Sequence, residues 1–136
     1  MALFNVFDIA GSAMSAQSVR LNTTASNLAN ATNVAGDASS AYRGKYPVFE
    51  TLLNDSLDGV SSGVAVRRII ESEKEPPRVH QPGHPLADAD GYVYLSNVDV
   101  MSEMVDMISA SRAYQNSAEV LNTSKQLLMR TLAIGR

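Results

Sequence analysis

The 136-residue sequence has no cysteine, no long apolar run and no cluster of basic residues. Without cysteine there can be no disulfide, no thiolate nucleophile and no cysteine-based zinc or iron–sulfur site. A membrane-spanning helix needs about 18 consecutive apolar residues, so we expect no direct membrane insertion. Eleven Lys and Arg against fourteen Asp and Glu give a net charge of −3 without a basic stripe, which argues against nucleic acid as a partner.

Catalytic motifs are also missing. The sequence has no G-x-S-x-G elbow and no G-x-x-x-x-G-K-[ST] phosphate loop. His80 and His84 are four residues apart, but Pro82 and Pro85 prevent the helix that would make this a metal-ligand spacing. We therefore interpret them as ordinary loop histidines. The sequence predicts no catalytic residue, no metal, no cofactor and no small-molecule substrate.

The segment around Asp88 and Asp90 has some likeness to a calcium-binding loop. With Gly91 in the glycine position, the first ligand would be Leu86 and the twelfth Asn97, so two ligands fail. An exposed Asx turn that leads into a strand is the better interpretation.

The start of the chain has no Lys or Arg before Arg20. A cleaved secretory signal begins with a basic region, so we expect none here. The length is within the range of one domain.

Proline and glycine divide the chain into three segments. All five prolines and six of the eight glycines lie between Gly36 and Gly91. The pattern predicts an N-terminal helix in 1–35, a β-rich connecting segment in 36–96 and a C-terminal helix in 97–136.

The first segment has large apolar residues at intervals of seven, which form one stripe on a helix: Phe7, Met14, Leu21 and Leu28. A companion row flanks this stripe: Leu3, Ala10, Gln17, Thr24 and Ala31. Arg20 is the only charged residue between Ile9 and Gly36. Such a helix has weak propensity, so we expect it to be marginal alone and to order on docking.

The last segment has no Gly or Pro between 97 and 134, which predicts one helix of roughly 50 to 55 Å. Ser96 and Asp99 fit a capping box, with Ser96 as N-cap. A stripe at spacings of three and four runs along it: Met104, Met107, Ser111, Tyr114, Ala118, Leu121, Lys125, Leu128 and Leu132.

The middle segment predicts short strands at 46–49, 64–70 and 92–95, with turns at Asp58–Gly59 and Ser61–Gly63. Residues 46–57 could instead include a helical turn.

The expected fold is mainly α with a small β segment. The N- and C-terminal helices would pair as an antiparallel coiled coil, with a β-hairpin or small sheet between them and Asp8 near Lys125. Apolar stripes of this kind often form only the core of a helical bundle. Here, however, the first helix has almost no charged residues on the sides that the last helix would not cover. We expect other chains to cover these sides.

Two longer stretches carry a family resemblance. Residues 12–31, centred on Asn27-Leu28-Ala29-Asn30, resemble the N-terminal signature of bacterial flagellar rod and hook proteins. Residues 97–116 are similar to the C-terminal signature of the same family. Residues 82–85 and 89–93, the short length and the long link after the first motif resemble the proximal rod branch.

The resemblance implies a structural subunit of the flagellar basal-body rod, not an enzyme. It implies assembly with other rod subunits and with itself into a tubular drive shaft, and export by the flagellar type III apparatus without a cleaved signal, so that the rod spans the periplasm. The expected assembly interface comprises Phe7, Met14, Leu21, Asn27, Leu28, Asn30, Met104, Met107, Tyr114, Ala118, Leu121, Leu128 and Leu132.

Two other classes of function remain open from the residues alone. One is a soluble coiled-coil adaptor or export chaperone with a discrete partner. The other is a small metal-dependent enzyme that would use His80, His84, Asp88 and Asp90.

Overall fold

The computed structural model describes residues 2–54 and 61–134, which form two long helices and five strands. The elements in chain order are α1 (Ala2–Asn30), β1 (Val34–Ala35), β2 (Lys45–Asn54), β3 (Ser61–Glu71), β4 (Arg78–His80), β5 (Tyr92–Leu95) and α2 (Val100–Ile134). The helices contain 29 and 35 residues, about half of the chain, so the mainly helical class with a small β part is confirmed.

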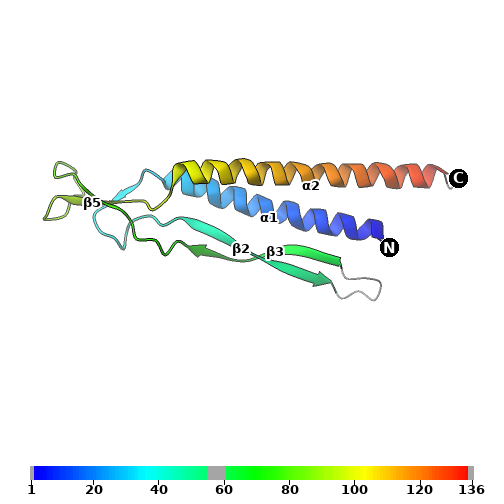
Figure 1. Ribbon diagram of the computed structural model, residues 1–136, viewed down its shortest axis with the longest axis horizontal. Coiled ribbons are helices and arrows are strands. Elements are labelled where there is room, and N and C mark those ends of the chain that lie inside the picture. The colour runs from blue at the N-terminus through cyan, green and yellow to red at the C-terminus, as the bar shows by residue number, and fades with distance from the viewer. Residues whose placement is uncertain (1, 55–60, 135–136) are drawn as a thin grey trace.

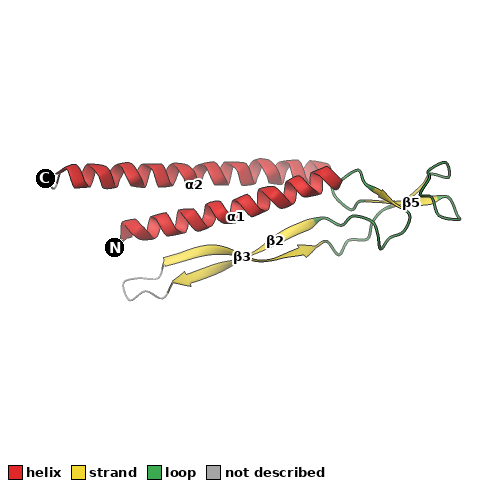
Figure 2. Ribbon diagram, turned by 180° about the vertical axis from the view of Figure 1, so that it is seen from behind, coloured by secondary structure: helices red, strands yellow, loops and turns green. Residues whose placement is uncertain are grey.

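The two helices lie side by side and run in opposite directions (Figure 1). The start of α1 and the end of α2 lie at the same end of the molecule, and α2 extends beyond α1 there (Figures 1 and 2). The helices are closest near the end of α1 and diverge toward its start.

The β2–β3 hairpin lies along α1 on the side away from α2, so α1 is the middle layer (Figure 2). The Ser12 hydroxyl of α1 accepts a hydrogen bond of 3.2 Å from the Val64 amide of β3. A Cβ atom at Gly63 would lie 3.0 Å from that hydroxyl oxygen, so glycine permits the close approach. The hairpin therefore covers one side of the uncharged first helix, and the expected contacts with other chains concern its remaining sides.

The hairpin strands are longer than the sequence predicted. Pairing runs from Lys45 opposite Glu71 to Asn54 opposite Ser61, with a bulge after Val48. The helical turn considered for this segment is absent from residues 46–54, and the predicted turn at 61–63 is wrong because these residues belong to β3. The predicted Asp58–Gly59 turn lies outside the described residues.

A second sheet, of order β1-β5-β4, lies at the end of the molecule opposite the start of α1. The predicted strand at 92–95 is confirmed as β5. The sequence missed β1 and β4 because strands of two and three residues have too little pattern to detect. β1 also shows that the segment 1–35 is helical only to Asn30.

The helix α2 begins at Val100, and Asp99 rather than Ser96 is its N-cap. The Asp99 carboxylate accepts a hydrogen bond of 3.0 Å from the Met101 amide and one of 3.1 Å from the Ser102 hydroxyl. Ser96 instead accepts from the Val98 amide in the preceding turn. The prediction was three residues early, because both residues are good caps and only the geometry separates them.

Small side chains dominate the buried interior. The buried apolar residues are Ala10, Ala16, Ala41, Val93 and Ala110. Glu103, Val93 and Asn27 are the largest of the fully buried side chains. The subunit therefore has little apolar core of its own among its described residues.

Candidate assembly surface

A row of small or polar residues at intervals of seven on α2 faces α1. These residues are Glu103, Ala110, Ser117 and Ser124. Ala110 is fully buried, and Glu103 is 2% exposed. The sequence analysis missed this row because it followed large apolar residues, although the seven-residue spacing was readable. Small residues here allow the helices to approach closely.

The stripe predicted on α2 lies to one side of this row. Met107, Ala118, Leu121 and Leu128 are half-buried. The other three members of the expected interface are exposed in the subunit, by 50% at Met104, 36% at Tyr114 and 69% at Leu132. These three side chains therefore remain available to other chains.

On α1 the predicted stripe is half-buried at Phe7, Met14, Leu21 and Leu28. The companion row is more enclosed, since Ala10 and Thr24 are buried. The side chains that α1 exposes beyond Ile9 are small and uncharged, as at Gly11, Ser15, Asn22, Ala25, Ser26 and Ala29.

Asn27 joins three parts of the chain. Its side-chain carbonyl accepts hydrogen bonds from the Lys45 amide at 2.8 Å and the Tyr42 hydroxyl at 3.1 Å. Its side-chain amide donates to the Lys45 carbonyl at 2.9 Å and to the Glu103 carboxylate at 3.1 Å. Asn27 is fully buried and therefore belongs to the interior of the subunit, not to its free surface.

Asn30, the last residue of the same motif, is half-buried and ends α1. Its side-chain amide donates to the Ser26 carbonyl at 2.8 Å, and its side-chain carbonyl accepts from the Asn33 side chain at 2.8 Å. The two asparagines of the motif thus have different roles, one joining the elements and one ending the helix.

Tyr46 lies beside the buried Glu103. Burial, a hydrogen bond with the Glu103 carboxylate and the charge of that group raise the pKa of Tyr46 to about 12. The tyrosine therefore stays neutral and can donate its proton toward the carboxylate.

An ion pair between Arg20 of α1 and Asp106 of α2 also connects the helices. The expected contact between Asp8 and Lys125 was wrong, because neither residue is in an ion pair of the described part of the chain. Residues near the start of α1, such as Val6, lie beside Val120 of α2, so Lys125 lies further along.

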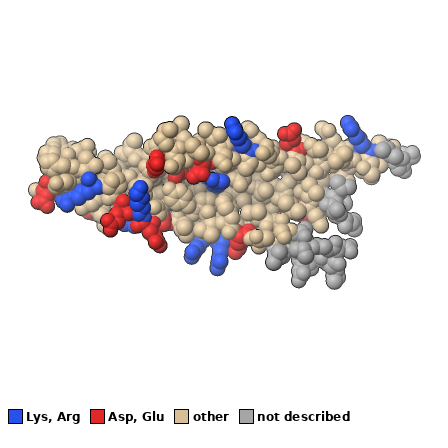
Figure 3. Space-filling model, in the orientation of Figure 1, with Lys and Arg blue, Asp and Glu red and all other residues tan. Residues whose placement is uncertain are grey.

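The diverging helices leave an open apolar groove of about 290 Å³. It is lined by Val6, Ile9, Ala10, Ala13, Asn116, Ser117 and Val120. On the face shown in Figure 3, most of the surface over the helix pair is neither acidic nor basic, and charged side chains gather toward the end that holds β5.

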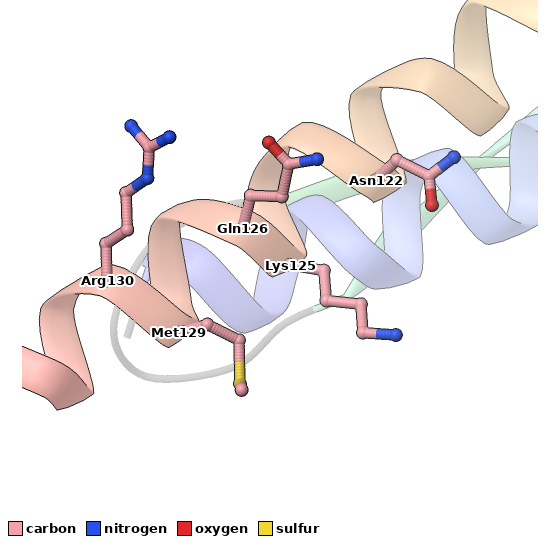
Figure 4. A pocket seen from close by; sticks show the side chains of 5 residues that line it. All are labelled: Asn122, Lys125, Gln126, Met129 and Arg130. Atoms are coloured by element: carbon pink, nitrogen blue, oxygen red, sulfur yellow. The ribbon is translucent and has the colours of Figure 1, made fainter.

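The most exposed apolar side chains lie at the two ends of α2, and the sequence analysis missed most of them. Near the start are Met101, Val105 and Ile108, and near the end are Met129 and Leu132. A second open hollow, of about 380 Å³, lies on α2 alone near its end and is lined by Lys125, Met129 and three polar neighbours (Figure 4).

Arg78 organises the segment that holds Asp88 and Tyr92. Arg78 lies 3.9 Å from the centre of the Tyr92 ring and pairs with Asp88 at 3.2 Å. The predicted Asx turn is confirmed, since Asp88 accepts from the amides of Asp90 and Tyr92. His80 lies in β4 rather than in a loop, with its ring against Tyr92.

Residues 2–54 and 61–134 contain no cluster of three or more His, Cys, Asp or Glu suited to a metal ion. Neither described helix is long and apolar enough to cross a membrane.

Comparisons with known proteins match both ends of the chain to one family. Residues 7–36 match the model "Flagella basal body rod protein", and residues 89–134 match "Flagellar basal body rod FlgEFG protein C-terminal". The chain is 52% identical over 136 residues to the flagellar basal-body rod protein FlgC of Escherichia coli O6:H1, with all of both chains covered. It is 53% identical over 137 residues to FlgC of Salmonella typhimurium, again with full coverage.

A more distant relative, FlgC of Buchnera aphidicola subsp. Baizongia pistaciae, is 36% identical over 140 residues and is also covered completely. These proteins are structural rod subunits and not enzymes, and they place the chain in the flagellar basal body with other rod components. The chain belongs to the FlgC family of flagellar basal-body rod proteins.

Proposed function

We propose that this structural subunit builds the wall of the proximal rod through the exposed faces of α1 and α2. The rod is a tubular drive shaft that transmits torque and through which flagellar proteins are exported. Within each subunit the two helices pair as an antiparallel coiled coil, with the β segment outside. The interface includes Phe7, Met14, Leu21, Leu28, Asn30, Met104, Met107, Tyr114, Ala118, Leu121, Leu128 and Leu132, while Asn27 holds the subunit together from within.

One observation carries the proposal. Met101, Met104, Val105 and Ile108 are each at least half exposed within two turns of α2. Removing apolar surface from water contributes about 25 cal/mol per Å², and contiguous exposed apolar patches mark interaction sites. The outer side of α1 offers a second surface, of small and uncharged side chains. Packing between subunits would supply the burial that the small core lacks.

We also propose that the chain is exported unfolded by the flagellar type III apparatus, without a cleaved signal, and that the rod spans the periplasm. The composition of the buried core supports this route. Because the buried apolar residues in the described part of the chain are four alanines and one valine, the isolated subunit has little hydrophobic free energy to resist unfolding.

The test uses Met104→Asp, with Gln115→Asp as its matched control. Both side chains are exposed on α2, so neither change disturbs the interior of the subunit. Met104→Asp places a charge in a contact that we expect to be dry, where an unpaired carboxylate costs several kcal/mol. We expect loss of swimming, no subunit in isolated basal bodies, and subunit in the periplasmic fraction, because export is spared.

Gln115→Asp should swim normally, because Gln115 lies in the polar middle of α2. Normal swimming of Met104→Asp would contradict the proposed interface. Two results together would instead support the adaptor function. One is a finite complex of the purified subunit with one discrete partner, and the other is the assembly of rods in cells that lack this subunit.

A further inference from the structure

Methionine is the only sulfur-containing residue type of the chain, because the sequence has no cysteine. A thioether is open to oxidation to the extent that solvent reaches it. Met101 is 72% exposed, Met129 63% and Met104 50%, whereas Met14 and Met107 are half-buried. A dissolved oxidant can therefore reach three of the described thioethers in the free subunit, and all three lie on α2.

Met101 and Met104 belong to an apolar patch at the start of α2. At about 100° per residue, the positions of Met101, Met104, Val105 and Ile108 span about 100° of the helix circumference. All four side chains are at least half exposed. They form the patch on which the proposed interface depends.

The polar groups beside this patch are acceptors or are already bonded. The open hollow next to Met101 has two polar lining residues, Ser102 and Asp106. The Ser102 hydroxyl donates to the Asp99 carboxylate at 3.1 Å, and the Asp106 carboxylate accepts from Arg20. An acceptor oxygen added to Met101 therefore finds no free side-chain donor among the residues that line this hollow.

Met129 has the opposite surroundings. The hollow near the end of α2 is lined by Asn122, Lys125, Gln126 and Arg130 as well as by Met129. Each of these four neighbours carries N–H donors, and Lys125 extends from the same side of α2 as Met129 (Figure 4). Met101 and Met129 therefore differ in the donors around them, although both are well exposed.

We propose that Met101 and Met104 form an oxidation-sensitive site that excludes an oxidised subunit from the rod, whereas oxidation of Met129 is tolerated. The oxidant is a hydroperoxide, such as hydrogen peroxide. The thioether sulfur attacks one peroxide oxygen, and an S–O bond forms as the O–O bond breaks. The departing hydroxide takes the proton of the transferred oxygen and leaves as water. The sulfur is thus oxidised by two electrons to the sulfoxide, a step that methionine sulfoxide reductases reverse.

The oxidation acts on the contact between subunits rather than on the fold of one subunit. A sulfoxide is polar and disrupts methionine-rich interfaces, and an acceptor buried without a donor is unfavourable. At Met101 and Met104 the new oxygen is buried against apolar side chains when subunits pack, whereas at Met129 the neighbouring N–H groups can bond to it. The inference rests on the proposed assembly through the exposed helix faces and adds a chemical control of that surface.

The first experiment measures the access of peroxide to each thioether. The purified full-length chain is treated with hydrogen peroxide, and the fragment-ion spectra of its peptides locate each added oxygen. Met101 and Met129 should be oxidised at least about threefold faster than Met14 and Met107, with Met104 between them. Equal rates at all of these sites would overturn the proposal.

The second experiment is a competition inside one cell. Wild-type subunit is produced together with the double variant Met101→Leu and Met104→Leu, since leucine has a similar volume and takes up no oxygen. Hydrogen peroxide that oxidises most of the unassembled wild-type subunit should lower the ratio of wild type to variant in new basal bodies about fivefold, the effect of one unsatisfied polar group. Damage to other components affects both subunits alike, so an unchanged ratio would refute the proposal.

The matched control is a competition between wild type and Met129→Leu. Both subunits keep Met101 and Met104, so the ratio reports on Met129 alone. Peroxide should leave this ratio unchanged. A fall as large as that for the first pair would contradict the assigned selectivity, because the donors around Met129 would then have no effect.

A third experiment uses no oxidant and separates this inference from the proposed interface. The pair Met101→Gln and Met104→Gln introduces polar side chains of similar length, and its incorporation in competition with wild type should fall about fivefold, while Met129→Gln should enter the rod normally. If the glutamine pair enters the rod as well as wild type but Met104→Asp does not, the interface stands and the oxidation site is wrong. If both enter normally, the interface is wrong as well.

Discussion

Asn27 of α1 donates a hydrogen bond of 3.1 Å to the Glu103 carboxylate of α2, and both side chains are removed from solvent. The same asparagine is bonded to both backbone groups of Lys45. The motif that carries the family resemblance thus positions both helices and the first long strand relative to one another.

Replacing Asn27 with alanine should destabilise the subunit by about 2 to 4 kcal/mol, because several buried polar groups lose their partner together. The measurement is the urea unfolding midpoint of the purified chain. Asn30→Ala is the control from the same motif and should cost less than about 1 kcal/mol, since its bonds are local and partly solvated. Equal losses would show that Asn27 does not join the three elements.

The cap of α2 can be tested through Asp99. The Ser102 hydroxyl, followed by the Met101 and Ser102 amides, lowers the pKa of Asp99 below its usual value of 3.8. Because the folded pKa is the lower one, this charge stabilises the fold above pH 4 and the effect is lost as the pH falls through the folded pKa.

Asp99→Ala should therefore lower the unfolding midpoint at pH 7, while Asp99→Asn, which keeps a capping oxygen, should lower it less. The difference between wild type and Asp99→Asn should shrink when the midpoints are measured near pH 3. A constant difference from pH 7 to pH 3 is incompatible with a charged cap.

The raised pKa of Tyr46 predicts that the stability of the folded chain falls at alkaline pH. Its pKa rises from 10.0 to about 12 in the folded chain, first through burial and then through Glu103. Its contribution to stability is complete below pH 10 and is lost as the pH rises through 12. Unfolding midpoints from pH 9 to 12 should fall more steeply for wild type than for Tyr46→Phe, whereas parallel profiles would contradict the assigned environment.

Gln17 marks an imperfection in the interior of the subunit. Its side-chain carbonyl oxygen is buried and has no hydrogen-bond partner among the described residues. Gln17→Met keeps a similar volume and removes the buried acceptor, so it should stabilise the isolated chain by about 1 kcal/mol. A lower unfolding midpoint for this variant would show that the oxygen has a partner in solution.

The sequence predicted the elements whose pattern is local and long. The 35 residues of α2 have no Gly or Pro, and β5 is a compact run of Tyr, Val and Leu. The face of each helix was harder to predict, because hydrophobic periodicity assumes that large apolar residues are buried. Here Met104 is exposed while Glu103 is buried, since the subunit packs small residues inside and leaves large ones outside.

Contacts that form only in the folded chain determine two features that the sequence did not predict, the N-cap of α2 and the role of Asn27. The preference for Asp99 over Ser96 as the cap depends on which side chain reaches the Met101 amide. The role of Asn27 depends on Lys45, which is 18 residues away and meets it only in the folded chain. Sequence spacing alone contains neither relationship.

A density map of the intact basal body tests the central claim most directly. The account predicts this subunit within the rod, with α1 and α2 in the inner wall, the β2–β3 hairpin outside them, and Met101, Val105 and Ile108 covered by neighbouring subunits. A map in which the rod lacks this chain, or in which that apolar row faces solvent, would contradict the account.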